Sequence, residues 1–148
     1  MKALIQRVQK ASVTVEHKTV GQINQGIAIL LGIGTSDTEK DINYIVNKIL
    51  NIRIFSGQHS HFDQSVTEIK GDILVVSQFT LHASIKKGRR PSFIDAAKSD
   101  LAINLFNKTI SLLEQSNLKI ETGIFGADML VEIHNDGPVT LMIDSKAD

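Results

Sequence analysis

The side chains that could do chemistry gather first in the segment Ser77-Gln78-Phe79-Thr80-Leu81, which follows the apolar run 73–76. Ser77, Gln78 and Thr80 supply two hydroxyls and an amide, and backbone N–H groups at the end of a strand could stabilise an oxyanion. A threonine nucleophile needs an adjacent base, and this segment contains no His, Asp or Glu. A positioning role for Thr80 is therefore favoured, and a covalent role stays open.

A second polar segment, Asn135-Asp136-Gly137-Pro138-Val139-Thr140, lies near the C-terminus. Gly137 has no Cβ, and Pro138 fixes φ and removes a donor, so a turn here can present bare carbonyl oxygens to a group that approaches closely. By itself this string is typical of a strand end followed by a tight turn.

Four cations, Lys86, Lys87, Arg89 and Arg90, surround Gly88 in a chain whose formal net charge is zero. A basic loop on a neutral body indicates a local phosphate contact, although a solvated charge run is an equal alternative.

The histidines and glycines predict no further centre. His82 and His134 lie beside the two polar segments, but a catalytic role for either is disfavoured. His59 and His61, with Asp63 nearby, lack the spacing of a metal site, and Gly32-Ile33-Gly34 lacks the third glycine of a dinucleotide loop. We expect neither a metal nor an organic cofactor.

Composition predicts one domain over residues 1–148, with 42% hydrophobic residues, 22% charged residues and no cysteine. No apolar stretch approaches the roughly 20 residues that span a bilayer, and the N-terminus runs into a strand pattern without a signal peptide. We expect a cytoplasmic protein.

Periodicity predicts an α+β fold: a curled, mainly antiparallel, barrel-like sheet with two main helices packed on one side. Helices are expected at about 38–51, with Ser36 or Asp37 as N-cap, and at about 100–115, with Ser99 as N-cap, Leu101 among its buried residues and Asn117 as a stop. Strands are expected near residues 3–8, 12–16, 19–23, 27–31, 73–76, 118–122, 129–134 and 139–143. Alternation along the strand that contains Phe79 would point its ring into the core.

Several strings, taken in order, resemble the D-aminoacyl-tRNA deacylases (D-tyrosyl-tRNA deacylases) over nearly the whole chain. The departures lie mainly in residues 56–64, where the family has a different hairpin. The matching strings are Ala3 to Val8, Ala11 to Val15, Arg53-Ile54-Phe55, Ile73 to Leu81, Lys87 to Phe93, Thr122-Gly123, Phe125 to Met129 and Asn135 to Thr140.

The resemblance implies hydrolysis of the ester of a D-aminoacyl-tRNA, and of glycine mischarged on tRNA. An aminoacyl ester is already activated, so orientation by the Ser77–Thr80 segment, including Phe79, would suffice, with help from the 2′-hydroxyl of the terminal ribose. Phe125, Ala127 and Met129 would form a platform for the terminal adenine, and the four cations would contact tRNA phosphates.

The resemblance also implies a homodimer in which Gly137-Pro138 is cis and enters the active site of the second subunit. Its carbonyls would hold the α-amino group and leave no space for the side chain of an L-residue, while Arg7 would bind the carbonyls of the loop. Two alternatives remain open: a sibling deacylase for mischarged L-alanyl-tRNA, with a trans Gly-Pro, and a non-enzymatic nucleic-acid-binding module.

Overall fold

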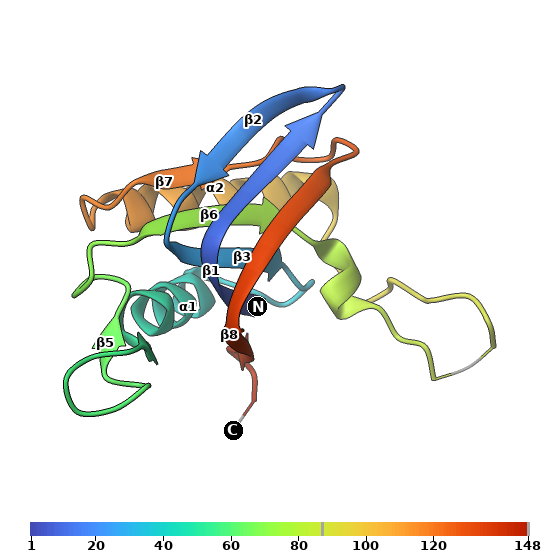
Figure 1. Ribbon diagram of the computed structural model, residues 1–148. Helices are drawn as coiled ribbons and strands as arrows, with labels where there is room; N and C mark the ends of the chain where they lie inside the picture. Colours follow the sequence, from blue (N-terminus) through green and yellow to red (C-terminus); the bar gives the residue numbers. More distant parts are fainter. Residues whose placement is uncertain (87, 148) are drawn as a thin grey trace.

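The computed structural model describes residues 1–86 and 88–147, so Lys87 lies outside the described residues. The elements follow in the order β1 (Lys2–Val15), β2 (Lys18–Ile23), β3 (Gly26–Gly32), α1 (Glu39–Asn51), β4 (Arg53–Phe55), β5 (Gln64–Ser65), β6 (Asp72–Ser77), the 3-10 helix η1 (Phe79–His82), α2 (Ser99–Glu114), β7 (Ile120–Thr122) and β8 (Leu130–Asp144). Figure 1 shows both α-helices behind the main sheet.

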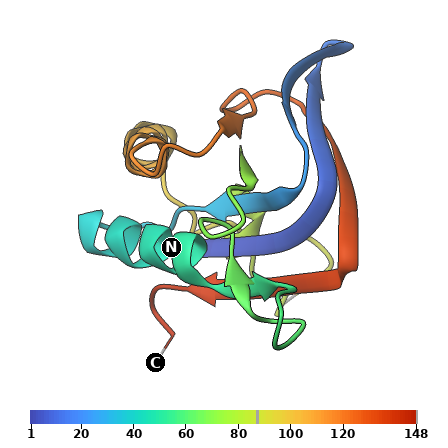
Figure 2. The ribbon, with the colours of Figure 1, turned by 60° about the vertical axis from the view of Figure 1, so that its left-hand side comes forward.

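The main sheet has the order β2-β1-β3-β6-β7, and β8 pairs with the other edge of β1. The pairs of β1 with β2, β3 and β8 are antiparallel, and those of β6 with β3 and β7 are parallel. The two ends of this order approach each other, because a Cβ on Gly21 would lie 2.6 Å from the carbonyl oxygen of Thr122. The predicted α+β fold with a curled, barrel-like sheet is confirmed, and the sheet is mixed (Figure 2).

Strand β3 is buried on both faces, as its continuous apolar run predicts. Ile27, Ile29 and Leu31 belong to the core beneath the helices, whereas Ala28 packs with Leu74 inside the curl of the sheet. Apolar side chains therefore cover both faces of the sheet at β3, and their packing holds the neighbouring strand β6 in position.

Helix α1 buries Ile42, Ile45, Val46 and Ile49, the stripe that its sequence predicts. The predicted N-cap is wrong, however. The N-cap is Thr38, whose backbone N–H and hydroxyl both donate to Asp41 Oδ2, at 2.7 and 3.0 Å. Asp37 is not available as a cap because its carboxylate binds the N-terminal ammonium.

Helix α2 begins one residue earlier than expected, with Lys98 at the N-cap and Ser99 in the first turn. Its buried stripe follows Ala102, Leu105, Phe106, Thr109 and Leu113, so the prediction that Leu101 is buried is wrong: Leu101 lies outside this stripe. Asn117 adopts φ of 60°, which ends the helical path as predicted. In the described part of the chain, no helix is long and apolar enough to cross a bilayer.

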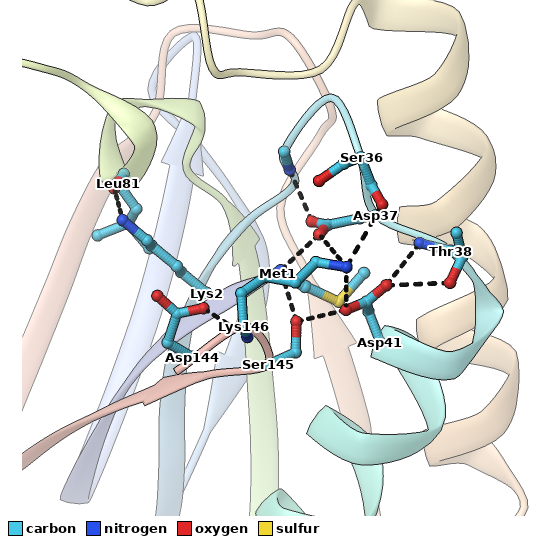
Figure 3. A network of polar contacts seen from close by, with 11 residues as sticks. Met1, Lys2, Ser36, Asp37, Thr38, Asp41, Leu81, Asp144, Ser145 and Lys146 are labelled. Atoms are coloured by element: carbon cyan, nitrogen blue, oxygen red, sulfur yellow. Dashed lines mark hydrogen bonds and ion pairs between the residues drawn. The ribbon is translucent and has the colours of Figure 1, made fainter. Parts of the chain in front are cut away.

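The N-terminus is anchored in a polar network, drawn in Figure 3. The Met1 ammonium is fully buried and donates to Asp37 Oδ1 at 2.6 Å and to Ser145 Oγ at 2.7 Å. Ser145 in turn donates to Asp41 Oδ1, which also lies 2.8 Å from Lys146 Nζ. These contacts connect the start of β1, the first turn of α1 and the residues that follow β8.

Candidate active site

Ser77 and Gln78 lie at the carboxyl end of β6, as predicted. The Gln78 backbone N–H donates to the Leu31 carbonyl at 2.8 Å, which extends the ladder with β3 by one residue. The chain then folds into η1, in which Leu81 N–H donates to the Gln78 carbonyl and Ala83 N–H to the Thr80 carbonyl. The end of the strand is thus held by backbone bonds on both sides.

A cavity of about 580 Å³ opens at this strand end, between the start of α2 and the segment that joins β7 to β8. Six of the predicted site residues line it: Ser77, Gln78, Phe79, Phe125, Ala127 and Met129. Segments separated by more than 40 residues are therefore brought together at one site, where polar and apolar side chains both line the cavity.

Thr80 lies beside this cavity and is exposed. Its hydroxyl accepts a hydrogen bond from Gln78 Nε2. The contact orients the side-chain amide of Gln78, a residue that lines the cavity.

Phe79 corrects an expectation. Alternation along β6 would point its ring into the core, but 57% of Phe79 is exposed and the ring lines the cavity. The reason is that the strand ends at Ser77 and the 3-10 helix begins at Phe79, so period-two alternation no longer applies.

Half-buried residues form the apolar part of the cavity wall. The Phe125 ring lies 5.8 Å from that of Phe106 in α2, centroid to centroid, so α2 supports it from behind. Gly123 provides space for Met129, because a Cβ at Gly123 would collide with Met129 Sδ. Phe125, Ala127 and Met129 thus supply apolar side chains to this side of the cavity.

Sequence reasoning missed three polar residues of this cavity: Lys98, Ser99 and Asp128. Lys98 and Ser99 form the start of α2, and the sequence pattern identifies Ser99 only as a helix cap. The pattern can locate the start of α2, but nothing in it places that start opposite Ser77.

The second polar segment forms a wide bulge within β8, so the expectation that a strand ends there is wrong. Val8 pairs with Asn135 and Gln6 with Thr140, which leaves Asp136 to Val139 facing Arg7 alone. At the base of the bulge, Asn135 Nδ2 donates to Thr140 Oγ1 at 2.7 Å and Val139 N–H donates to Asn135 Oδ1 at 3.2 Å.

Gly137 and Pro138 form the exposed tip of the bulge, joined by a cis peptide bond. Gly137 adopts φ of 115°, a conformation that L side chains rarely adopt. A Cβ there would also lie 2.7 Å from Arg7 Nη2. Glycine is therefore required at this position twice over, by the backbone and by the neighbouring guanidinium.

Arg7 clamps the bulge to the body of the protein. Its Nε donates to the Asp136 carbonyl at 3.3 Å and lies 3.0 Å from Asp136 Oδ2, while Nη1 donates to the Ile54 carbonyl in β4 at 2.6 Å. The guanidinium thus bridges β8 and β4 and reaches the carbonyl that precedes Gly137.

The structure leaves the other predicted groups apart from the cavity. Neither Gly137, Pro138 nor Arg7 is among its lining residues, and Lys86, Arg89 and Arg90 lie on the exposed loop after η1. His82 and His134 also lie outside it. Across residues 1–86 and 88–147, no group of three or more His, Cys, Asp or Glu side chains is placed to hold a metal ion.

Known proteins are similar to this chain in both sequence and fold. A protein 55% identical over 146 residues, from Aquifex aeolicus (strain VF5), is described as a D-aminoacyl-tRNA deacylase, and the match covers 99% of each chain. Another of the same description, from Flavobacterium psychrophilum, is 52% identical over 147 residues, covering 99% of this chain and 98% of the relative.

Two solved structures have the same fold. One, described as "c-Myc DNA Unwinding Element Binding Protein", has a TM-score of 0.93 at 42% identity and covers 99% of this chain and all of its own. The other, a probable eukaryotic D-amino acid tRNA deacylase, has a TM-score of 0.84 at 17% identity over 96% of this chain and 97% of its own. The family model for D-Tyr-tRNA(Tyr) deacylase matches residues 4–144, and the chain therefore belongs to the D-Tyr-tRNA(Tyr) deacylase family.

Proposed function

We propose that this chain hydrolyses D-aminoacyl-tRNA to free D-amino acid and tRNA in the cavity at the end of β6. The observation that carries the proposal is the convergence of Ser77, Gln78 and an apolar wall around about 580 Å³, a volume typical of small-ligand sites. Relatives about half identical over their full length share the description D-aminoacyl-tRNA deacylase, which favours this activity over removal of L-alanine.

The chemistry needs orientation more than a strong nucleophile. Water adds to the ester carbonyl, the bond to the ribose oxygen breaks, and that oxygen takes up a proton. The 2′-hydroxyl of the terminal ribose assists, while Ser77 and the Gln78 amide bind and orient the ester and strand-end N–H groups stabilise the oxyanion. Thr80 acts by holding the Gln78 side chain, the hydrogen bond seen in the structure.

Chiral selection comes from a second copy of the chain. The Gly137-Pro138 tip is exposed, clamped by Arg7 and absent from the cavity of its own chain. In a homodimer, the tip of one subunit enters the cavity of the other and binds the substrate α-amino group through its carbonyls. The side chain of an L-residue then collides with backbone, a D-side chain points outward, and glycine passes because it has no side chain.

The tRNA end is bound on both sides of η1. The terminal adenine stacks on the surface formed by Phe125, Ala127 and Met129, and phosphates contact Lys86, Lys87, Arg89 and Arg90. Because charged tRNAs are used in the cytoplasm, the protein acts there.

The test compares hydrolysis of D-tyrosyl-tRNA, L-tyrosyl-tRNA and L-alanyl-tRNA by protein dialysed against a chelator. Release of D-tyrosine alone, at an undiminished rate after dialysis, is the expected result. Preferential release of L-alanine would favour the sibling deacylase. Binding of tRNA without any hydrolysis would favour a nucleic-acid-binding module, the class suggested by the basic loop.

A D-tyrosyl-tRNA with a 2′-deoxy terminal ribose tests the assisted mechanism separately. It should be cleaved far more slowly than the ribose form, whereas a mechanism that depends on an enzyme nucleophile would leave the two rates similar.

A further inference from the structure

An exposed aromatic pair stands at the mouth of the cavity. The rings of Phe79 and Phe93 lie 5.0 Å apart, centroid to centroid, with an interplanar angle of 65°. Phe79 lines the cavity, and Phe93 extends the aromatic surface beyond the lining residues. With Phe79 57% and Phe93 37% exposed, the two rings form an open corner.

Phe93 is held in place by its backbone neighbours. Ser92 and Ser84 exchange two hydrogen bonds of 2.8 and 2.9 Å, and Ala96 N–H donates to the Phe93 carbonyl at 3.0 Å. These contacts fix the base of the loop that reaches away from the sheet after η1 (yellow in Figure 1). The backbone at Phe93 is therefore ordered before any ligand arrives, and the contact of its ring with Phe79 limits the freedom that the ring must lose on binding.

The charges around the pair favour a polyanion. Lys86, Arg89 and Arg90 are exposed on the same loop, whereas Asp95 is the one acidic side chain among the described residues 84–86 and 88–98. The cavity beside the loop adds one charge of each sign, Lys98 and Asp128, so the excess of positive charge comes from the loop. Exposed aromatic faces beside cations are the usual means of binding single-stranded nucleic acid, because every base has a face that can stack.

We propose that the Phe79–Phe93 corner binds the nucleobase that precedes the terminal adenosine of the tRNA. This inference rests on the proposed function, which places the terminal adenosine in the cavity. The RNA chain leaves the cavity past Phe79. The base of the preceding nucleotide stacks at the corner with Phe93, and the 5′ phosphate of that nucleotide lies toward the basic loop. The corner thus makes recognition depend on RNA beyond one nucleotide.

The experiment uses two substrates, the D-tyrosyl ester of adenosine and that of the trinucleotide CCA, and reports the ratio of their kcat/KM values. Phe93→Leu keeps apolar volume but removes the aromatic face, Phe93→Tyr keeps the face, and Ile94→Ala is the control, an apolar neighbour that is 85% exposed. We expect Phe93→Leu to lower the trinucleotide-to-adenosine ratio about tenfold, within the usual strength of one stacked base, while the other two variants leave it within about twofold.

A second readout does not depend on activity. Fluorescence polarisation of a fluorescein-labelled CCA oligonucleotide that carries no amino acid measures binding, which Phe93→Leu should weaken by a similar factor. If kcat/KM falls equally on both esters, the ratio stays unchanged and Phe93 only supports Phe79. If kcat/KM falls on neither ester, Phe93 makes no contact with the base. Either result overturns the inference. Dissociation of a dimer in Phe93→Leu would assign the corner to a protein interface and also overturns it. Absence of hydrolysis by the unsubstituted protein, with oligonucleotide binding lost in Phe93→Leu, would refute the proposed function and retain the corner.

Discussion

Arg7 Nε lies 3.0 Å from Asp136 Oδ2 and within hydrogen-bond distance of the Asp136 carbonyl, so one side chain holds both the backbone and the side chain of the residue that leads into Gly137. The same guanidinium binds Ile54 on β4, which makes the tip of the bulge a rigid extension of the body. In the proposed mechanism this loop excludes one enantiomer by collision, which requires a loop that does not yield, and the Arg7 contacts would supply that stiffness.

Arg7→Lys should therefore lower kcat/KM for D-tyrosyl-tRNA by about tenfold or more, since an ammonium cannot make all of these contacts and charge-assisted hydrogen bonds contribute about 1.5–3 kcal/mol each. The measurement is steady-state hydrolysis, with circular dichroism to verify folding. Arg53→Lys is the matched control because its ion pair with Glu68 is exposed. Equal effects of the two substitutions would contradict a special role for Arg7.

Gly137→Ala tests the shape of the tip. The substitution introduces a Cβ at φ of 115° and 2.7 Å from Arg7 Nη2, so it should cost about 1–3 kcal/mol in the free energy of unfolding and reduce deacylation strongly. Gly88→Ala separates the two causes, because Gly88 also has a positive φ but a Cβ added there would meet nothing within 4 Å. Gly137→Ala should therefore lose more unfolding free energy, measured with urea, and more ester hydrolysis than Gly88→Ala.

Thr80→Val distinguishes positioning from covalent catalysis. Loss of the hydrogen bond from Gln78 Nε2 should lower kcat by about tenfold, the order expected for one interaction. A nucleophile would instead be essential, with a loss on the order of 10⁴ or more. Thr19→Val, at an exposed position of β2, is the control, and single-turnover hydrolysis of D-tyrosyl-tRNA is the measurement. No acyl-enzyme should be trapped on acid quenching.

The outcome at Phe79 and Asp37 shows where local patterns stop being informative. The stripe of α1 is predictable because a helix buries one face whatever it packs on, and β3 is predictable because its run is apolar throughout. The local pattern makes Asp37 a cap, but an ammonium 36 positions earlier in the chain takes its carboxylate. The same kind of pattern places Phe79 in the core by continuing its strand, whereas the backbone turns at Gln78 to form η1.

The site shows the same division. Ser77 and Gln78 can be assigned from their position after an apolar strand and from a family resemblance. Lys98 and Asp128 cannot, because a cavity lining is a property of how α2 and the β7–β8 segment fold against β6. The bulge in β8 resembles a strand end in the sequence, since one chain's pattern cannot reveal that both sides continue to pair with β1.

Asp41 should make stability depend on pH at the acid end. Burial would raise its pKa, but hydrogen bonds from Lys146, Ser145 and Thr38 outweigh that effect and hold the pKa well below its usual range. A depressed pKa in the folded state stabilises the protein above the unfolded pKa of about 3.9, and this stabilisation is lost as the pH falls through the folded pKa.

Asp41→Asn should thus lower the free energy of unfolding by about 1–3 kcal/mol at pH 7, and the difference from the unsubstituted protein should shrink below about pH 4. Urea unfolding at pH 7 and pH 3 measures both values. Glu39→Gln, in the same turn but exposed and paired with Lys108, should change little. A difference that grows on acidification would show that the network does not act through the Asp41 charge.

The basic loop should determine how tRNA binding responds to salt. If Lys86, Lys87, Arg89 and Arg90 contact four phosphates of a single-stranded end, log affinity should fall with log salt at a slope near −3, from roughly −0.7 per contact. Replacing Arg89 and Arg90 by Gln should then reduce the slope by about 1.4. The double variant Lys18→Gln and Lys40→Gln removes the same charge from exposed positions elsewhere and should leave the slope unchanged. Affinities for uncharged tRNA between 50 and 200 mM salt provide the measurement, and equal slopes for both double variants would place the phosphate contacts outside this loop.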